Sequence, residues 1–274
     1  MYRPRVLPTP RRRSEGIATS ADGTRIAWYR YGTGARAVLF VPTWNIVDAR
    51  VVGHQVVDLE SHATVITYDP RGAGASGRPE RGYDFPLHAA DALAVLEATE
   101  IEQAALVTAS RGVNAALLLI ADHPERLDRL AVVGPYMQLD DELPDHEWIE
   151  ALRTDWPGFI VPFMHEVFTE PGSADVIAEM IAIGLEATPE VVARQELELD
   201  WQRPARLLAR VGCPTLVIHG EEDAAVHASH AERIVDTMPN AQLELVAAGG
   251  HRPDIRTPEL VNPLLRRFLI DSTP

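Results

Sequence analysis

Short apolar runs recur along the chain and mark the strands of a sheet. Residues 24–29 alternate between polar and apolar positions, which is typical of a half-buried strand. Five further runs are continuously apolar and one is weaker: residues 37–41, 63–68, 104–108, 130–133 and 215–218, and the weaker residues 243–246. Runs this short and this apolar predict strands that are buried on both faces, as in a parallel sheet.

Between these runs, apolar residues recur at helical spacing. The spacing predicts helices over residues 87–98, 112–120 and 258–269, of which the second is apolar on nearly every side, as expected of a centrally packed helix. Strands that alternate with helices predict an α/β fold, in which a mostly parallel central sheet is flanked by helices. Residues 1–13 are expected to form an irregular arm.

The alternation stops after about residue 135, where helical patterns continue without a convincing strand. Residues 136–203 contain 16 acidic and three basic side chains, a net charge of −13 in a chain of net charge −15. We therefore predict an α/β core formed by residues 1–135 and 206–274, and an inserted, all-helical cap formed by residues 136–205. Such a cap is expected over the carboxyl edge of the sheet, where open α/β sheets bind ligands. A helical appendage with only its own core is the alternative.

Composition excludes several classes of protein. Acidic residues outnumber Lys and Arg by 40 to 25, the opposite of what a nucleic-acid-binding protein needs. The single cysteine, Cys213, excludes an intramolecular disulfide framework and a cysteine-rich zinc site. No apolar run approaches the ~18 residues of a membrane span, and no secretory signal is visible. We expect a cytoplasmic protein that binds neither nucleic acid nor membrane. The sequence is compatible with a homodimer.

Ser110 lies in the strongest chemical motif of the chain. It directly follows an apolar strand, has Ala109 before it and Gly112 two positions after it, and leads at once into a helix. Such a tight turn from strand to helix is typical of a nucleophile elbow, which raises the serine hydroxyl above the sheet. The dipole of the following helix favours a developing negative charge there. A serine that only caps the helix is the alternative.

Two later strands also end in residues suited to acyl transfer. Residues 215–218 run into a turn that contains Asp223, and residues 243–246 run into two glycines and His251. Ser110, Asp223 and His251 thus follow one another in the chain order of α/β-hydrolase triads, each after a predicted strand. Other carboxylates remain alternatives for the acid: Glu221, Glu222, Asp140 and Asp141.

From about residue 14 to residue 269, the chain resembles the α/β-hydrolase superfamily, in its esterase-like branch with a helical cap. Residues 69–79 resemble its D-x-R-G-x-G-x-S loop, residues 219–223 its H-G-x-x-D turn and residues 249–251 its G-x-H turn. The resemblance implies that Ser110 is the nucleophile, His251 the general base and Asp223 the group that orients the imidazole. We expect no cofactor, and no metal ion because the histidines are scattered without the spacing of metal ligands.

Two positions depart from the family pattern. A His-Gly pair usually follows the third strand, whereas this chain has Pro-Thr-Trp-Asn at residues 42–45. Matching by position assigns the oxyanion hole to the backbone N–H groups of Trp44 and Arg111. Thr43 resists the positive φ that a glycine accepts, and Thr108 replaces the first glycine of G-x-S-x-G. An altered hole would lower hydrolysis or favour other chemistry.

The predicted function is hydrolysis of a carboxylic ester, lactone or thioester through an acyl-enzyme on Ser110. Aromatic residues are expected to bind a small, partly apolar substrate: Trp44, Trp148, Trp156, Phe159 and Phe163. A non-hydrolytic protein of the same fold, such as a lyase, a cyclase or a ligand receptor, is the alternative, and an aminopeptidase-like activity is a weaker one. Residues 72–77 match G-x-G-x-x-G, but the helix that a dinucleotide site needs is not predicted after them.

Overall fold

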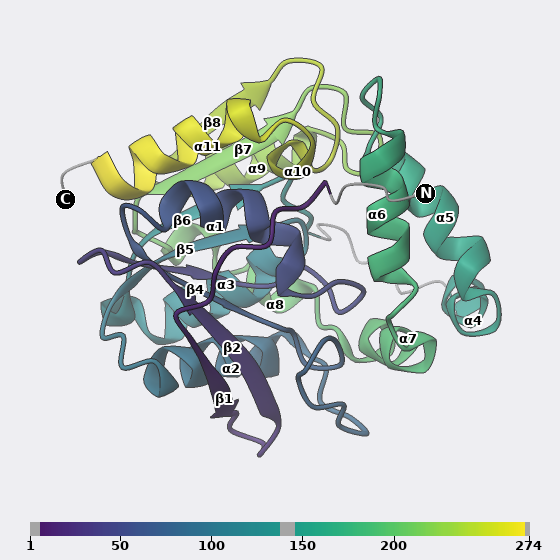
Figure 1. Cartoon of the computed structure of the whole chain (residues 1–274), viewed down its shortest axis with the longest axis horizontal. Coiled ribbons are helices and arrows are strands. Elements are labelled where there is room, and N and C mark those ends of the chain that lie inside the picture. The colour runs from purple at the N-terminus through teal and green to yellow at the C-terminus, as the bar shows by residue number, and fades with distance from the viewer. Residues whose placement is uncertain (1–5, 138–145, 272–274) are drawn as a thin grey trace.

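An eight-stranded sheet forms the centre of the computed structural model, which describes residues 6–137 and 146–271 (Figure 1). The strands lie in the order β1-β2-β4-β3-β5-β6-β7-β8. Their bounds are β1 (Ser14–Thr19), β2 (Arg25–Tyr31), β3 (Ala37–Phe40), β4 (Thr64–Tyr68), β5 (Ala104–Ala109), β6 (Leu127–Val133), β7 (Thr215–Gly220) and β8 (Ala241–Val246). β2 runs antiparallel to β1 and β4, whereas all other neighbours are parallel. The predicted α/β fold with a mostly parallel sheet is confirmed.

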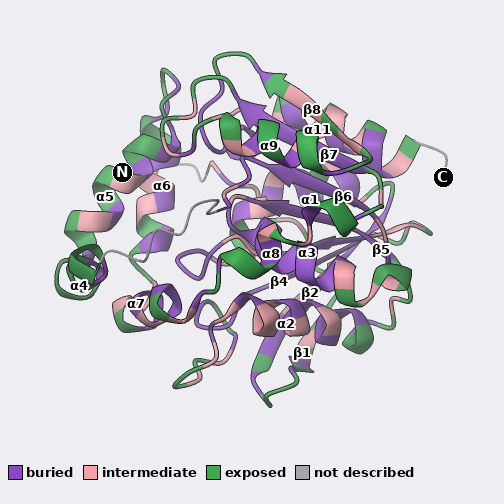
Figure 2. Ribbon diagram, turned by 180° about the vertical axis from the view of Figure 1, so that it is seen from behind, coloured by how far each residue is buried: buried purple, intermediate pink, exposed green. Residues whose placement is uncertain are grey.

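Helices cover both faces of this sheet. One face packs against α2 (Phe85–Ala98), α3 (Gly112–Asp122) and α9 (Ser229–Thr237), and the other against α1 (Gly53–Leu59) and α11 (Pro258–Arg266). Every residue of β4, β5 and β7 is buried, so the continuous apolar runs do correspond to strands covered on both sides (Figure 2). The shorter elements are α10 (Pro253–Arg256), the 3₁₀ turns Ala49–Val52, Pro124–Arg126 and Leu208–Arg210, and a π turn at Arg267–Asp271.

The sequence analysis did not predict β1, α1 or α9. β1 is an edge strand in which only Ala18 is buried, so it lacks the apolar run by which a central strand is recognised. It is defined by its pairing with β2, from Ser14 opposite Arg30 to Thr19 opposite Arg25. Such an element depends on its neighbour more than on its own composition.

Between β6 and β7 the described chain is helical. The helices are α4 (His146–Thr154), α5 (Trp156–Val167), α6 (Ala174–Gly184), α7 (Pro189–Glu198) and α8 (Gln202–Ala205). We call residues 146–205 the insertion; α4 to α7 stand together at one side of the sheet (Figure 1). The insertion shares an apolar cluster with the loop after β3, in which Ile160 and Met164 pack with Trp44 and Val47. It is therefore joined to the core and does not form a separate hydrophobic unit.

Over the described ranges 6–137 and 146–271, no helix combines the length and the apolar character needed to cross a bilayer.

Candidate active site

Ser110 sits at a strained turn between β5 and α3. Its φ is +50°, in the left-handed region that side chains other than glycine rarely adopt. The Ser110 N–H donates to the Val133 carbonyl at 2.9 Å, so the neighbouring strand β6 holds the turn. A Cβ at Gly112 would lie 2.5 Å from the Pro42 carbonyl oxygen, so only glycine fits there. The geometry is that of a nucleophile elbow.

Both departures from the family pattern have a structural account. The Thr108 hydroxyl donates to the Val41 carbonyl at 2.9 Å, so it ties β5 to the end of β3 without disturbing the elbow. Thr43 is not among the described residues with positive φ. The loop after β3 therefore follows a path that needs no glycine at this position.

The structure brings Ser110, His251 and Asp223 together. The Ser110 Oγ lies 3.0 Å from His251 Nε2, and His251 Nδ1 lies 2.8 Å from Asp223 Oδ2. A carboxylate only accepts hydrogen bonds, so Nδ1 carries the proton and Nε2 is left to accept from the hydroxyl. Asp223 Oδ1 accepts from the N–H groups of Ala225 and Val226 at 2.9 and 2.8 Å. The acid is thus fixed from both of its oxygens.

The other candidates for the acid are not in this position. Glu221 and Glu222 are exposed on the turn that carries Asp223, and the imidazole contacts Asp223. Asp140 and Asp141 lie outside the described residues.

His219 is a second, fully buried histidine beside the same carboxylate. Its Nε2 lies 3.1 Å from the Val226 carbonyl and 3.4 Å from Asp223 Oδ2, so an Nε2–H donates toward both. Burial lowers the pKa of His219, and the charge of Asp223 only partly opposes this. His219 therefore stays neutral and adds one more donor beside Asp223. The sequence analysis used it as part of a motif and assigned it no contact.

The two proposed oxyanion donors lie next to each other. β3 and β5 are parallel neighbours, so the loops after them meet at one edge, and the Arg111 guanidinium carbon lies 3.9 Å above the Trp44 ring. Neither the backbone N–H of Trp44 nor that of Arg111 donates to any residue in the described part of the chain. Both N–H groups are therefore available for an incoming oxygen.

The Arg111 side chain joins the nucleophile turn to the insertion, a contact that the sequence analysis missed. Its Nη1 lies 2.5 Å from Oε1 of Glu196 in α7, a residue 85 positions away. Burial raises the pKa of Glu196, whereas the Arg111 charge opposes that rise. Nothing in the local sequence of either residue identifies its partner.

All five aromatic residues predicted to bind substrate gather in one cluster. Trp44 meets Phe159 and Phe163 edge-on, with ring centroids 6.2 and 5.7 Å apart. Trp148 and Trp156 contact Phe159, and the indole N–H of Trp156 donates to the Gly184 carbonyl. Trp44, Phe159 and Phe163 thus lie where the insertion meets the loop after β3, whereas Trp156 supports the insertion itself.

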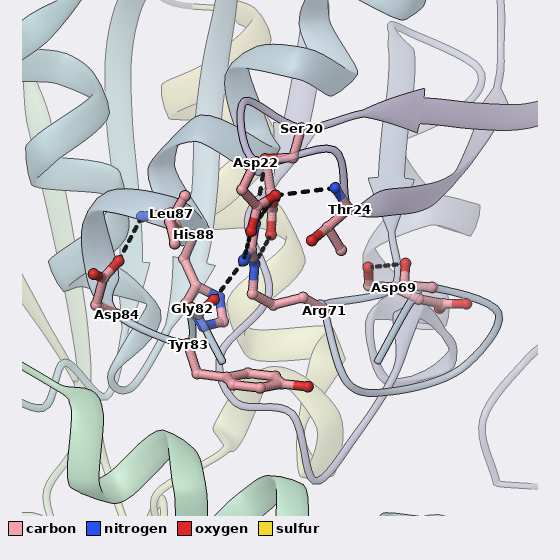
Figure 3. A network of polar contacts seen from close by, with 12 residues as sticks. Ser20, Asp22, Thr24, Asp69, Arg71, Gly82, Tyr83, Asp84, Leu87 and His88 are labelled. Carbon is pink, nitrogen blue, oxygen red and sulfur yellow. Dashed lines mark hydrogen bonds and ion pairs between the residues drawn. The ribbon is translucent and has the colours of Figure 1, made fainter. Parts of the chain in front are cut away.

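The glycine-rich loop after β4 is held in place by buried polar contacts and by a hydrogen bond within the loop. The Arg71 guanidinium is fully buried and binds both oxygens of Asp91 at 2.7 and 2.6 Å. It also reaches Asp22 and the Gly82 carbonyl (Figure 3). The loop closes on itself through the Gly72 N–H, which donates to the Gly77 carbonyl at 2.8 Å. No helix follows until Phe85, so the phosphate-binding helix of a dinucleotide site is not in place. Within residues 6–137 and 146–271, no group of three or more His, Cys, Asp or Glu side chains is placed so that it could hold a metal ion.

Comparisons with known proteins agree with the fold. A family model described as the alpha/beta hydrolase fold matches residues 44–159. A Caulobacter vibrioides protein provisionally named carbamate hydrolase RutD is 30% identical over 228 residues, which cover 78% of this chain and 83% of that protein. The human serine hydrolase BPHL is 27% identical over 254 residues, covering 91% and 84%. The solved structure of Est816, an N-acyl homoserine lactone degrading enzyme, is 26% identical with a TM-score of 0.81, covering 92% and 100%.

Proposed function

The chain belongs to the α/β-hydrolase superfamily and is an enzyme of that fold, and from this premise we propose that it hydrolyses a carboxylic ester, lactone or thioester through an acyl-enzyme on Ser110. One observation carries the proposal: a continuous hydrogen-bonded chain runs from the Ser110 hydroxyl through His251 to Asp223, with distances of 3.0 and 2.8 Å. A serine hydroxyl is a weak nucleophile until a base takes its proton, and this arrangement supplies the base.

In the proposed reaction, Ser110 Oγ attacks the acyl carbonyl while His251 Nε2 takes the hydroxyl proton. Asp223 stabilises the imidazolium that forms. The N–H groups of Trp44 and Arg111 donate to the oxyanion of the tetrahedral intermediate. His251 then returns the proton to the leaving alcohol or thiol, and an acyl-enzyme remains. A water molecule activated by His251 releases the acid and restores Ser110.

The substrate is proposed to be small and partly apolar. Trp44, Phe159 and Phe163 offer aromatic surface at the junction of the insertion and the core, which suits an alkyl or acyl portion. The net charge of −13 on residues 136–203 disfavours anionic substrates near the insertion. The names of the relatives, one a lactone-degrading enzyme and one a serine hydrolase, support the same class of chemistry.

The second candidate is a non-hydrolytic protein of this fold, a lyase, a cyclase or a ligand receptor. The loop Pro42 to Asn45 favours it, because this loop replaces the His-Gly pair of the family pattern. In that case the Ser110 hydroxyl would hold a ligand and would not be acylated.

A panel of substrates separates the two candidates. p-Nitrophenyl esters of graded acyl length, an aliphatic lactone and an amino-acid anilide are offered to the wild type and to the Ser110→Ala variant. The proposal predicts turnover of esters or lactones that rises with acyl length to an optimum and is lost in the variant. Turnover of the anilide alone would point to an aminopeptidase-like activity. Inactivity on every substrate would favour the second candidate.

A further inference from the structure

The turn that carries His251 is held from outside by the insertion. The Gly250 N–H donates to Glu170 Oε1 at 2.8 Å, and the His251 N–H donates to the Val167 carbonyl at 3.1 Å. A third contact reaches the turn of the acid, where the Thr169 hydroxyl donates to the Glu222 carbonyl at 3.2 Å. Residues 167–170 at the end of α5 therefore contact both turns that support the proposed reaction.

The turn needs such external support because its own backbone is permissive. Ala248 has a φ of +53°, and two glycines separate it from His251. On the side of the sheet, the Gly249 N–H donates to the Val246 carbonyl at 3.0 Å, and the Gly249 carbonyl accepts from the Glu222 N–H at 2.9 Å. The backbone bonds from the core thus end at Gly249, and the backbone N–H groups of Gly250 and His251 donate to the insertion.

Glu170 is the side chain that makes this contact, and it is buried. Its exposed fraction is 7%, and the second carboxylate oxygen, Oε2, has no hydrogen-bond partner in the described structure. The Glu170 carbonyl accepts from the Ser173 hydroxyl at 2.6 Å, and Ser173 in turn accepts from Arg256 Nε at 2.8 Å. A buried carboxylate with one donor is costly, so the donor it does bind is the main compensation for its burial.

We propose that Glu170 is a positioning residue for His251: by accepting from the Gly250 N–H, it fixes the turn so that Nε2 points at the Ser110 hydroxyl. This inference rests on the proposed function. The general base is then aligned only while residues 167–170 are seated on the turn, so the insertion completes the catalytic geometry. A misplacement of about 1 Å in such a group costs on the order of 10²-fold in rate.

The test compares Glu170→Ala, which removes the acceptor, with Glu170→Gln, which keeps an acceptor oxygen and removes the charge. Glu166→Ala is the matched control, because Glu166 lies in the last turn of α5, shortly before Glu170, and is exposed. Three quantities are measured: kcat and KM on the best ester, the rate at which a fluorophosphonate acylates Ser110, and the downfield proton resonance of His251 Nδ1–H, assigned by its loss in Asp223→Ala.

We expect Glu170→Ala to lower kcat and the acylation rate by about 10²-fold with little change in KM, and to shift or broaden the Nδ1–H resonance. Glu170→Gln should keep most of the kcat and of the acylation rate, with an Nδ1–H resonance close to that of the wild type. Glu166→Ala should match the wild type. Where Glu170→Ala does not fold, Glu170→Asp replaces it, because its shorter side chain withdraws the acceptor and keeps the charge.

Two results would overturn the proposal. In the first, Glu170→Ala keeps the acylation rate and the His251 Nδ1–H resonance of the wild type, although it lacks the acceptor. The other is an equal loss in Glu170→Gln, which would assign the effect to charge. The resonance also separates this inference from the proposed function, since it needs no turnover. A wild type that reacts with neither ester nor fluorophosphonate would refute the proposed function, while the change in the resonance would still decide the role of Glu170.

Discussion

The turns that carry Ser110 and His251 are built in different ways, although both follow a strand of the same sheet. The Ser110 turn is held by neighbouring strands, through the Ser110 N–H to Val133 and the Thr108 hydroxyl to Val41. The His251 turn is held by the insertion, through Val167 and Glu170. The backbone of the nucleophile turn is therefore held by the core, and among the described residues the insertion reaches that turn only through the Arg111 side chain. The backbone of the His251 turn is held by the insertion, while Asp223 of the core holds the imidazole.

Because the two turns are held differently, stability and activity are expected to respond differently to changes at each of them. Contacts to strand backbones leave little freedom, because a strand cannot move without breaking its ladder. Contacts to helix ends and side chains of an insertion can shift with that insertion. We expect changes at the Ser110 turn to reduce stability along with activity, and changes at the His251 turn to reduce activity first.

The largest expected effect is that of removing the nucleophile. Ser110→Ala should lower kcat by about 10⁶-fold, the scale reported when a residue of this kind is removed. Ser229→Ala, an exposed serine on α9, is the control and should keep the wild-type rate. Turnover of the best ester measures both. Substantial activity in Ser110→Ala would mean that the serine turn is not where the chemistry occurs.

The next effect concerns the ion pair between the serine turn and α7. Arg111→Met leaves the Glu196 carboxylate buried without its partner, so we expect a loss of about 3–5 kcal/mol in the free energy of unfolding. The double variant Arg111→Met/Glu196→Leu should recover most of this, because apolar residues replace the pair. Urea denaturation measures both. Equal stability of the single variant and the wild type would show that the pair does not couple the turn to the insertion.

A smaller effect contrasts one glycine from each turn. A Cβ at Gly112 meets the Pro42 backbone oxygen at 2.5 Å, so Gly112→Ala should cost about 1–3 kcal/mol of stability. A Cβ at Gly250 meets the ends of the Thr169 and Glu170 side chains at 2.9 and 3.0 Å, and these can move. Gly250→Ala should therefore lose less stability but still lose activity. Thermal unfolding and kcat, measured together, would contradict this division if Gly250→Ala were the less stable variant.

The smallest effect at neutral pH is expected from substituting His88. This residue joins α2 to the insertion through a 3.1 Å contact with Gln195. Burial, helped by the positive charges of Arg71 and Arg111, lowers the pKa of His88 to about 3. An unfolded histidine titrates near ~6.5, so the unfolded chain binds more protons between these values. Stability should therefore fall as the pH falls from about 6.5 toward 3. His88→Gln should weaken that dependence and leave pH 7 unaffected; an unchanged acid profile would contradict the assignment.

The local sequence was sufficient to predict a structural feature wherever the residues of one segment determine their own environment. The runs at residues 63–68 and 104–108 became β4 and β5, and Ser110 occupies the strained turn expected from Ala109 and Gly112. Those features follow from burial on both faces and from the small size of the neighbours of the elbow. The motif around Asp223 likewise predicted a carboxylate at the end of β7.

Contacts between distant segments could not be predicted in the same way. Glu196 and Glu170 look like surface carboxylates in an acidic, helical stretch, yet both are buried against turns of the core. Their partners, Arg111 and Gly250, are 85 and 80 positions away, and only the packing of the insertion brings them together. β1 was missed for a related reason, since an edge strand takes its structure from the strand that it pairs with.

The most direct test of the account is intact-protein mass spectrometry after reaction with a fluorophosphonate, followed by peptide mapping. We expect a single adduct on Ser110 in the folded wild type, and none in Ser110→Ala or His251→Ala within the same time. An adduct on a different serine, or an unlabelled wild type that is fully folded, would contradict the claim that His251 activates Ser110 for acyl transfer.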